Sequence, residues 1–230
     1  MNDDQAALSQ FGGVARLFPL PNVVLFPHVI QPLHIFEPRY RQMTTDALAG
    51  DQLICLVLLQ PGWEEEYEGK PPLHSVACLG RILDHQRLPD GRFNLLLRGL
   101  SRARIVQEVE QLKEYRCARL ELLEDAGLPG AGMARKLRRM LGQRVRPWLP
   151  AQSPILEQFD KLFQSELPLG ALTDRMGFVL PVPVEMKQAL LEELDVEDRV
   201  KRLMHHLETS EPEKTEAPKQ IKFPPDFSEN

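Results

Sequence analysis

Several side chains of this sequence belong to the types that enzymes and binding sites use. Six histidines are present, but none falls in an H-E-x-x-H pattern or in the spacing of a cysteine–histidine zinc site. The sequence has no G-x-S-x-G motif, which would present a serine nucleophile on a sharp turn, and no G-x-x-x-x-G-K-[ST] loop to cradle a triphosphate. We therefore expect no catalytic residues, no metal site and no cofactor.

Two charged clusters have an ordinary structural interpretation. Glu64, Glu65 and Glu66 resemble paired carboxylates for acid–base work, but nothing nearby predicts desolvation, so a solvated loop tip is favoured. His205 and His206 stand near the end of a predicted helix, where adjacent side chains point in different directions and positive charge suits the helix dipole.

The sharpest binding candidates lie where a predicted strand gives way to a predicted helix. They are Phe36, Glu37, Arg39, Tyr40 and Arg41. Aromatic, acidic and basic side chains together can line a groove that grips an extended peptide by strand addition and side-chain pockets. The alternative is structural: Phe36 and Tyr40 are core residues, and Glu37 pairs with a nearby arginine.

A loop rich in glutamate carries two further candidates, Trp63 and Tyr67. Exposed aromatic residues often anchor a partner, which makes both of them peptide-binding candidates. A Trp63 side chain folded back over the protein is an equally good interpretation.

A basic stretch offers the main indication of nucleic-acid binding. It comprises Arg135, Lys136, Arg138, Arg139, Arg144 and Arg146. Apolar residues recur between them near helical spacing, so the arginines are also what the solvated face of an amphipathic helix would present. RNA binding is kept as the alternative function.

These candidates depend on the elements that position them, and residues 17–40 constrain those elements most. Five prolines stand among apolar residues there: Pro19, Pro21, Pro27, Pro32 and Pro38. Proline resists helix interiors and favours extended geometry in the residue before it. We predict extended segments at residues 15–20 and 30–36, followed by a helix that begins at Glu37 and Pro38, since proline is tolerated in a first turn.

The rest of the chain divides into a β region and a helical region. Strands are predicted at residues 52–59, 75–85, 92–100, 102–109 and 116–123, with a hairpin turn at Asp90 and Gly91. Helices are predicted at residues 134–145, from Ser153, and at 172–180, 184–194 and 196–207, with Asp195 capping the last. Together they predict four or five packed helices.

Bulk properties are those of an ordinary globular protein. The 230 residues carry a formal net charge of −5, which argues against a general nucleic-acid binder. The acidic N-terminus lacks the pattern of a signal peptide, and no apolar run is long enough to span a membrane. Cys55, Cys78 and Cys117 are widely spaced in apolar surroundings and predict buried, reduced thiols. We expect a cytoplasmic protein.

Five blocks, in this order, resemble the N-terminal domain of Lon protease. They are LFPLPNVVLFP at 17–27, PLHIFEPRY at 32–40, VACLGRI at 76–82, LPDGRFN at 88–94 and LRGLSRAR at 97–104. The resemblance covers residues 14 to about 208. It is closest in kind to free-standing bacterial forms that lack the ATPase and Ser-Lys protease domains.

This resemblance implies an α+β fold, with an N-terminal PUA-like β-barrel or pseudo-barrel followed by a C-terminal helical bundle. The expected division is a tail at 1–13, a β subdomain at 14–125, a helical subdomain at 126–208 and a disordered tail at 209–230. The implied function is non-catalytic binding of unfolded or extended polypeptide. An adaptor role beside a separate ATP-dependent protease is its more specific form.

Overall fold

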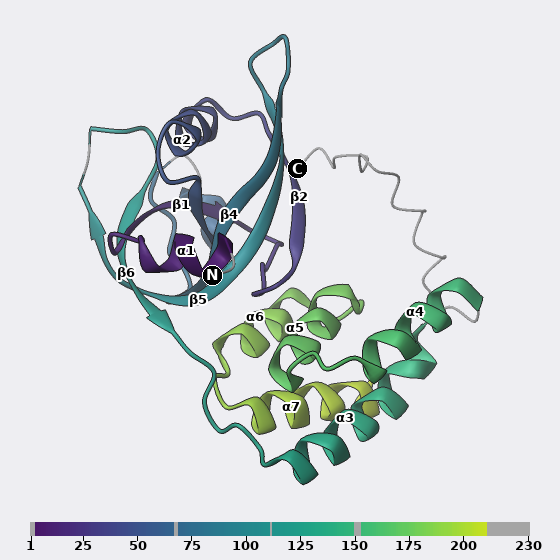
Figure 1. Ribbon diagram of the computed structural model, residues 1–230. Helices are drawn as coiled ribbons and strands as arrows, with labels where there is room; N and C mark the ends of the chain where they lie inside the picture. Colours follow the sequence, from purple (N-terminus) through teal and green to yellow (C-terminus); the bar gives the residue numbers. More distant parts are fainter. Residues whose placement is uncertain (1–2, 67–68, 111, 150–152, 211–230) are drawn as a thin grey trace. The chain divides into compact units, whose positions relative to one another are not determined.

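The computed structural model in Figure 1 describes residues 3–66, 69–110, 112–149 and 153–210. The chain forms two compact units that divide after Leu123. The first unit holds all the strands of the described chain, and the second, from Glu124, holds five α-helices. The predicted α+β class is confirmed.

The first unit consists of strands with a few short helices between them. In chain order its elements are α1 (Asp3–Ser9), β1 (Val14–Leu20), β2 (Ile30–Ile35), α2 (Pro38–Leu48), β3 (Leu53–Leu58), the 3-10 helix η1 (Trp63–Glu66), β4 (Val76–Arg87), β5 (Phe93–Val109) and β6 (Cys117–Leu123). The proline-rich opening therefore forms two strands, and α2 begins at Pro38 as predicted.

The strands form one mixed sheet in the order β2-β5-β4-β3-β1-β6. Only the β1–β3 pair is parallel among the described pairings. β6 pairs with β1 and also with the second half of β5, so five strands complete a ring of pairings. β2 stands outside this ring and pairs with β5 alone among the described strands.

The core of the first unit lies on the inner side of this ring. All six residues of β3 are buried, which explains their unbroken apolar run. Helix α1 adds Ala7 and Leu8 to the core, and Phe11 follows. The sequence interpretation did not anticipate this helix, although Asp3 and Asp4 supply the acidic first turn that favours a helix start.

The prediction of two strands at 92–100 and 102–109 is wrong, because β5 is a single strand of 17 residues. A register shift lets it bend without ending: Leu79 pairs with Ser101, whereas Gly80 pairs with Gly99. Gly99 also passes close to the backbone, since a Cβ there would lie 2.0 Å from the Phe26 carbonyl oxygen. Glycine is thus required for close packing at this bend.

The second unit is helical throughout most of its described length. Its elements are α3 (Ala131–Val145), the 3-10 helix η2 (Arg146–Trp148), α4 (Ser153–Gln164), α5 (Leu169–Val179), α6 (Val184–Glu192) and α7 (Val196–Thr209). Helix α7 lies between α3 and α5 (Figure 1). Asp195 caps it as predicted, accepting a hydrogen bond from the Asp198 amide at 3.0 Å.

A buried arginine ties the start of this unit to its helices. Arg199 on α7 is fully buried and donates to Asp174 on α5 at 2.8 Å and to Asp125 on the segment before α3. Asp174 is itself 2% exposed. A buried charge is tolerated only when it is paired, so these three side chains depend on one another.

Candidate functional site

An apolar hollow of about 510 Å³ lies along β2 in the first unit. We call it the β2–α2 groove. Its lining comes from β1 and the two residues after it, from β2 and its connection to α2, from the first turn of α2, and from η1. The lining residues are Phe18, Leu20, Pro21, Asn22, Leu33, His34, Ile35, Phe36, Glu37, Tyr40, Trp63 and Glu64. Four of these residues, Phe36, Glu37, Tyr40 and Trp63, are candidates predicted from the sequence.

Buried apolar side chains form the floor of the groove. Leu33 and Ile35 point inward from β2 and are 4% and 1% exposed. Tyr40 packs against Phe18 with ring centroids 4.6 Å apart, and both are buried. The structural alternative for Tyr40, a core position, is therefore confirmed.

Phe36 is different because it stands at the rim. It is 41% exposed, and its ring stacks on that of His34 with centroids 6.2 Å apart. The core alternative for Phe36 is wrong. Trp63 is half-buried at the start of η1 and also lines the groove. The groove thus combines a fixed apolar floor with aromatic side chains that a ligand can contact.

The charged residues beside the groove hold one another in place. Glu37 occupies the N-cap position of α2 and forms an ion pair with Arg39 at 2.9 Å. The Arg39 guanidinium also lies 4.8 Å from the centroid of the Tyr40 ring. The predicted pairing of Glu37 with a nearby arginine is therefore confirmed, and Arg39 fixes the first turn of α2.

His34 links the groove to the turn between β4 and β5. Its Nδ1 lies 2.7 Å from the Asn94 side-chain oxygen, and its Nε2 lies 3.3 Å from Arg92. Arg92 in turn pairs with Asp90 at 2.7 Å. These contacts fix one polar wall of the groove.

Two remaining candidates that the structure describes, Arg39 and Arg41, are not among the residues that line the groove. Arg41 lies on another side of α2, in a hollow that it shares with Arg87. Tyr67 lies outside the described residues. Sequence analysis missed the floor residues Leu33 and Ile35, although their period-two alternation along a strand could have placed them on one face.

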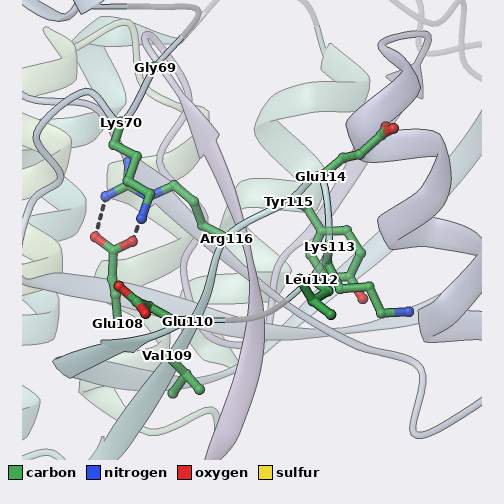
Figure 2. Close-up of a pocket in the computed structure, with 10 residues that line it drawn as sticks. All are labelled: Gly69, Lys70, Glu108, Val109, Glu110, Leu112, Lys113, Glu114, Tyr115 and Arg116. Carbon is green, nitrogen blue, oxygen red and sulfur yellow. Dashed lines mark hydrogen bonds and ion pairs between the residues drawn. The ribbon is translucent and has the colours of Figure 1, made fainter.

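A second hollow of about 450 Å³ lies around the β5–β6 connection (Figure 2). Three of the charged residues that line it form ion pairs within the protein. Arg116 makes two contacts with Glu108, one of them 2.9 Å from Nε to Oε2. Lys113 and Tyr115 each reach Asp46 on α2 at 2.8 Å. These contacts attach the β5–β6 hairpin to α2. The hollow is therefore a weaker candidate for ligand binding than the β2–α2 groove.

The basic stretch lies on α3, with Arg146 at the start of η2, and three of its six members contact other parts of the second unit. Arg138 donates to the carbonyls of Phe163, Ser165 and Leu167, which close the end of α4. Ion pairs join two more of its arginines to acidic partners, Arg144 to Glu208 and Arg146 to Asp160. This arrangement adds no support for RNA binding.

The described residues also bear on three other kinds of feature: metal sites, membrane-spanning helices and reactive thiols. No group of three or more metal-ligating side chains occurs among them, and none of their helices is long and apolar enough to cross a membrane. All three cysteines are buried, as predicted. Burial raises the pKa of the Cys55 thiol to about 12, so it remains protonated and unreactive at neutral pH.

Comparison with known proteins decides the family. Residues 14–209 match the family of the ATP-dependent protease La (LON) substrate-binding domain. The chain belongs to this family. The match comprises most of both compact units, and it places the β2–α2 groove inside the substrate-binding domain of the family.

Relatives and solved structures agree with this assignment. Lon protease 2 of Myxococcus xanthus is 28% identical over 200 residues, which is 84% of this chain and 23% of the relative. The chain thus spans about a quarter of the length of the Lon proteases it matches. The N-terminal domain of Mycobacterium avium complex Lon protease aligns with a TM-score of 0.63 at 17% identity, covering 85% of this chain and 98% of that one.

A second solved structure, a Lon N-terminal domain protein from Xanthomonas campestris, aligns with a TM-score of 0.57 at 23% identity. It covers 84% of this chain and 97% of its own. At such identities the two structures establish the fold only.

Proposed function

We propose that this protein is a non-catalytic module that binds unfolded or extended polypeptide segments in the β2–α2 groove. Membership of a substrate-binding domain family supports the general role. We assign the binding site to the groove because this apolar hollow is lined by β2, and β2 is the terminal strand in the sheet order.

A terminal strand offers backbone donors and acceptors to an incoming chain, and an adjacent hollow accepts its side chains. Pro32 within β2 limits this surface, because it supplies no amide donor. We therefore assign most of the affinity to side-chain contacts with Phe36 and Trp63 rather than to a long backbone ladder.

We extend the proposal from the family assignment to the architecture of the two units and to the role of the protein in the cell. The ring of strand pairings supports a PUA-like barrel at 14–125, and the packed helices support a bundle at 126–208. The protein acts in the cytoplasm without a cofactor or peptidase activity of its own, as an adaptor that presents polypeptides to a separate ATP-dependent protease.

Substitution of Phe36 by alanine tests the site. The exposed 41% of this residue corresponds to about 80 Å² of an aromatic side chain of about 200 Å². If a ligand covers that area, its burial contributes about 2 kcal/mol at about 25 cal/mol per Å², or about 30-fold in Kd. We expect Phe36→Ala to weaken binding of a labelled apolar peptide by up to this factor in fluorescence anisotropy.

Leu83 on β4 provides the matched control, because it is 43% exposed and does not line the groove. Leu83→Ala should leave the Kd unchanged. Equal affinity of wild type and Phe36→Ala would remove the groove as the site. Absence of saturable binding to any apolar peptide would remove the polypeptide-binding function itself.

A further inference from the structure

Two arginines stand together on the other side of the first turn of α2. Arg41 from α2 and Arg87 from the end of β4 line a polar hollow of about 310 Å³, together with the turn at Gly91. The β2–α2 groove ends at the same helix turn, since Glu37 and Tyr40 line the groove while Pro38 lines this hollow.

The neighbours that hold the two guanidinium groups in place are an aromatic ring and a glycine, not acidic side chains. Arg87 lies over the ring of Phe93, 5.8 Å from its centroid. Arg41 lies against Gly91, where an added Cβ would be 2.1 Å from its Nη2. Gly91 has a φ of 84°, so glycine both permits the turn and leaves room for the guanidinium.

The charges around this hollow do not balance. Arg39 pairs with Glu37, and Arg92 pairs with Asp90. Within the described chain, Arg41 and Arg87 have no carboxylate within ion-pair distance. A local excess of positive charge therefore stands on a protein whose formal net charge is −5.

We infer that Arg41 and Arg87 form a subsite for a carboxylate side chain of the polypeptide bound in the β2–α2 groove. The inference rests on the proposed function and gives its substrate class: an extended segment with an apolar anchor and a nearby aspartate or glutamate. Guanidinium groups suit this ligand because their fixed N–H donors match both oxygens of a carboxylate.

The helix turn sets the spacing between anchor and acid. A helix with its side chains is about 10 Å across, and an extended chain advances about 3.3 Å per residue. We therefore place the acidic residue of the test peptides about three positions from the apolar anchor.

Three labelled peptides test this subsite by fluorescence anisotropy. They share one aromatic anchor and differ only three positions away on both sides, where they carry glutamate, glutamine or lysine. Partly exposed ion pairs contribute about 0.2–1 kcal/mol each, so two arginines predict about 2- to 30-fold tighter binding of the glutamate peptide than of the glutamine peptide. The preference should vanish in about 1 M salt, where the Debye length is about 3 Å.

The variant Arg41→Gln/Arg87→Gln should lose the preference but still bind the glutamine peptide. The control Arg119→Gln/Arg139→Gln changes the net charge equally at two exposed positions that do not line the hollow, and should keep the preference. Circular dichroism verifies that both variants fold.

Equal binding of the three peptides by wild type would overturn the subsite, as would an equal loss of preference in the control. In either case, weakened binding by Phe36→Ala would still uphold the proposed function. If no peptide binds the wild-type protein, the proposed function is refuted, and the subsite that rests on it is refuted with it.

Discussion

Replacement of Arg199 by methionine should destabilise the second unit, because it removes a buried cation that is paired with two carboxylates. The substitution keeps much of the side-chain volume but removes the guanidinium that faces Asp174 and Asp125. Asp174 is 2% exposed, so its carboxylate loses a paired charge in a place that water does not reach. Breaking a buried pair by removing one partner costs about 3–5 kcal/mol.

The two tryptophans of the sequence make this loss measurable unit by unit. Trp148 belongs to the second unit and Trp63 to the first. In a Trp63→Phe background, urea unfolding followed by fluorescence reports on the second unit alone. We expect Arg199→Met to lower the free energy of unfolding there by about 3–5 kcal/mol.

A double variant separates charge from packing. Asp174→Asn in the Arg199→Met background replaces the buried carboxylate with a neutral amide and should recover part of the loss. A loss below about 1 kcal/mol in the single variant, the value of an exposed pair, would refute the reasoning. No recovery in the double variant would show that packing, rather than charge, sets the cost.

Three further changes address the first unit. Gly99→Ala should lower its free energy of unfolding by about 1–3 kcal/mol in urea titrations, because the new Cβ meets the Phe26 carbonyl; a neutral result would contradict the tight packing. Hydrogen bonds from Lys113 and Tyr115 lower the pKa of Asp46, so its contribution to stability is present above about pH 4 and is lost as pH falls through the folded value; Asp46→Asn should flatten that loss in acid unfolding curves. Burial and Asp46 raise the pKa of Tyr115 to about 12, so a tyrosinate absorbance step near this pH should disappear in Tyr115→Phe, and a titration complete near pH 10 would oppose this.

The conformational restrictions of individual residues were enough to predict the secondary structure near the start of the chain. Pro32 and Pro38 restrict their neighbours so strongly that the strand at 30–35 and the start of α2 follow from the sequence. Asp195 was likewise predictable as a cap, because its side chain needs only the amide three residues later.

Pairing between distant segments was not predictable in this way. The residues around Gly99 suggested a break between two strands, and only the partner strand β4 shows that a bulge absorbs the bend. The groove required the same knowledge, since Phe18 reaches Tyr40 through packing that no short window of sequence contains. Arg138 appeared to be a solvated charge, yet it binds carbonyls 25 to 29 residues away.

The central claim is that the β2–α2 groove, rather than another surface, takes up the polypeptide. Fluorescence titration with an apolar extended peptide tests it most directly, because Trp63 lines the groove and Trp148 belongs to the other unit. In Trp148→Phe, the emission of Trp63 should change and saturate with the Kd measured by anisotropy. In Trp63→Phe, the emission of Trp148 should stay constant at peptide concentrations where anisotropy shows that this variant binds. Saturating binding that leaves Trp63 unchanged and alters Trp148 would contradict the account.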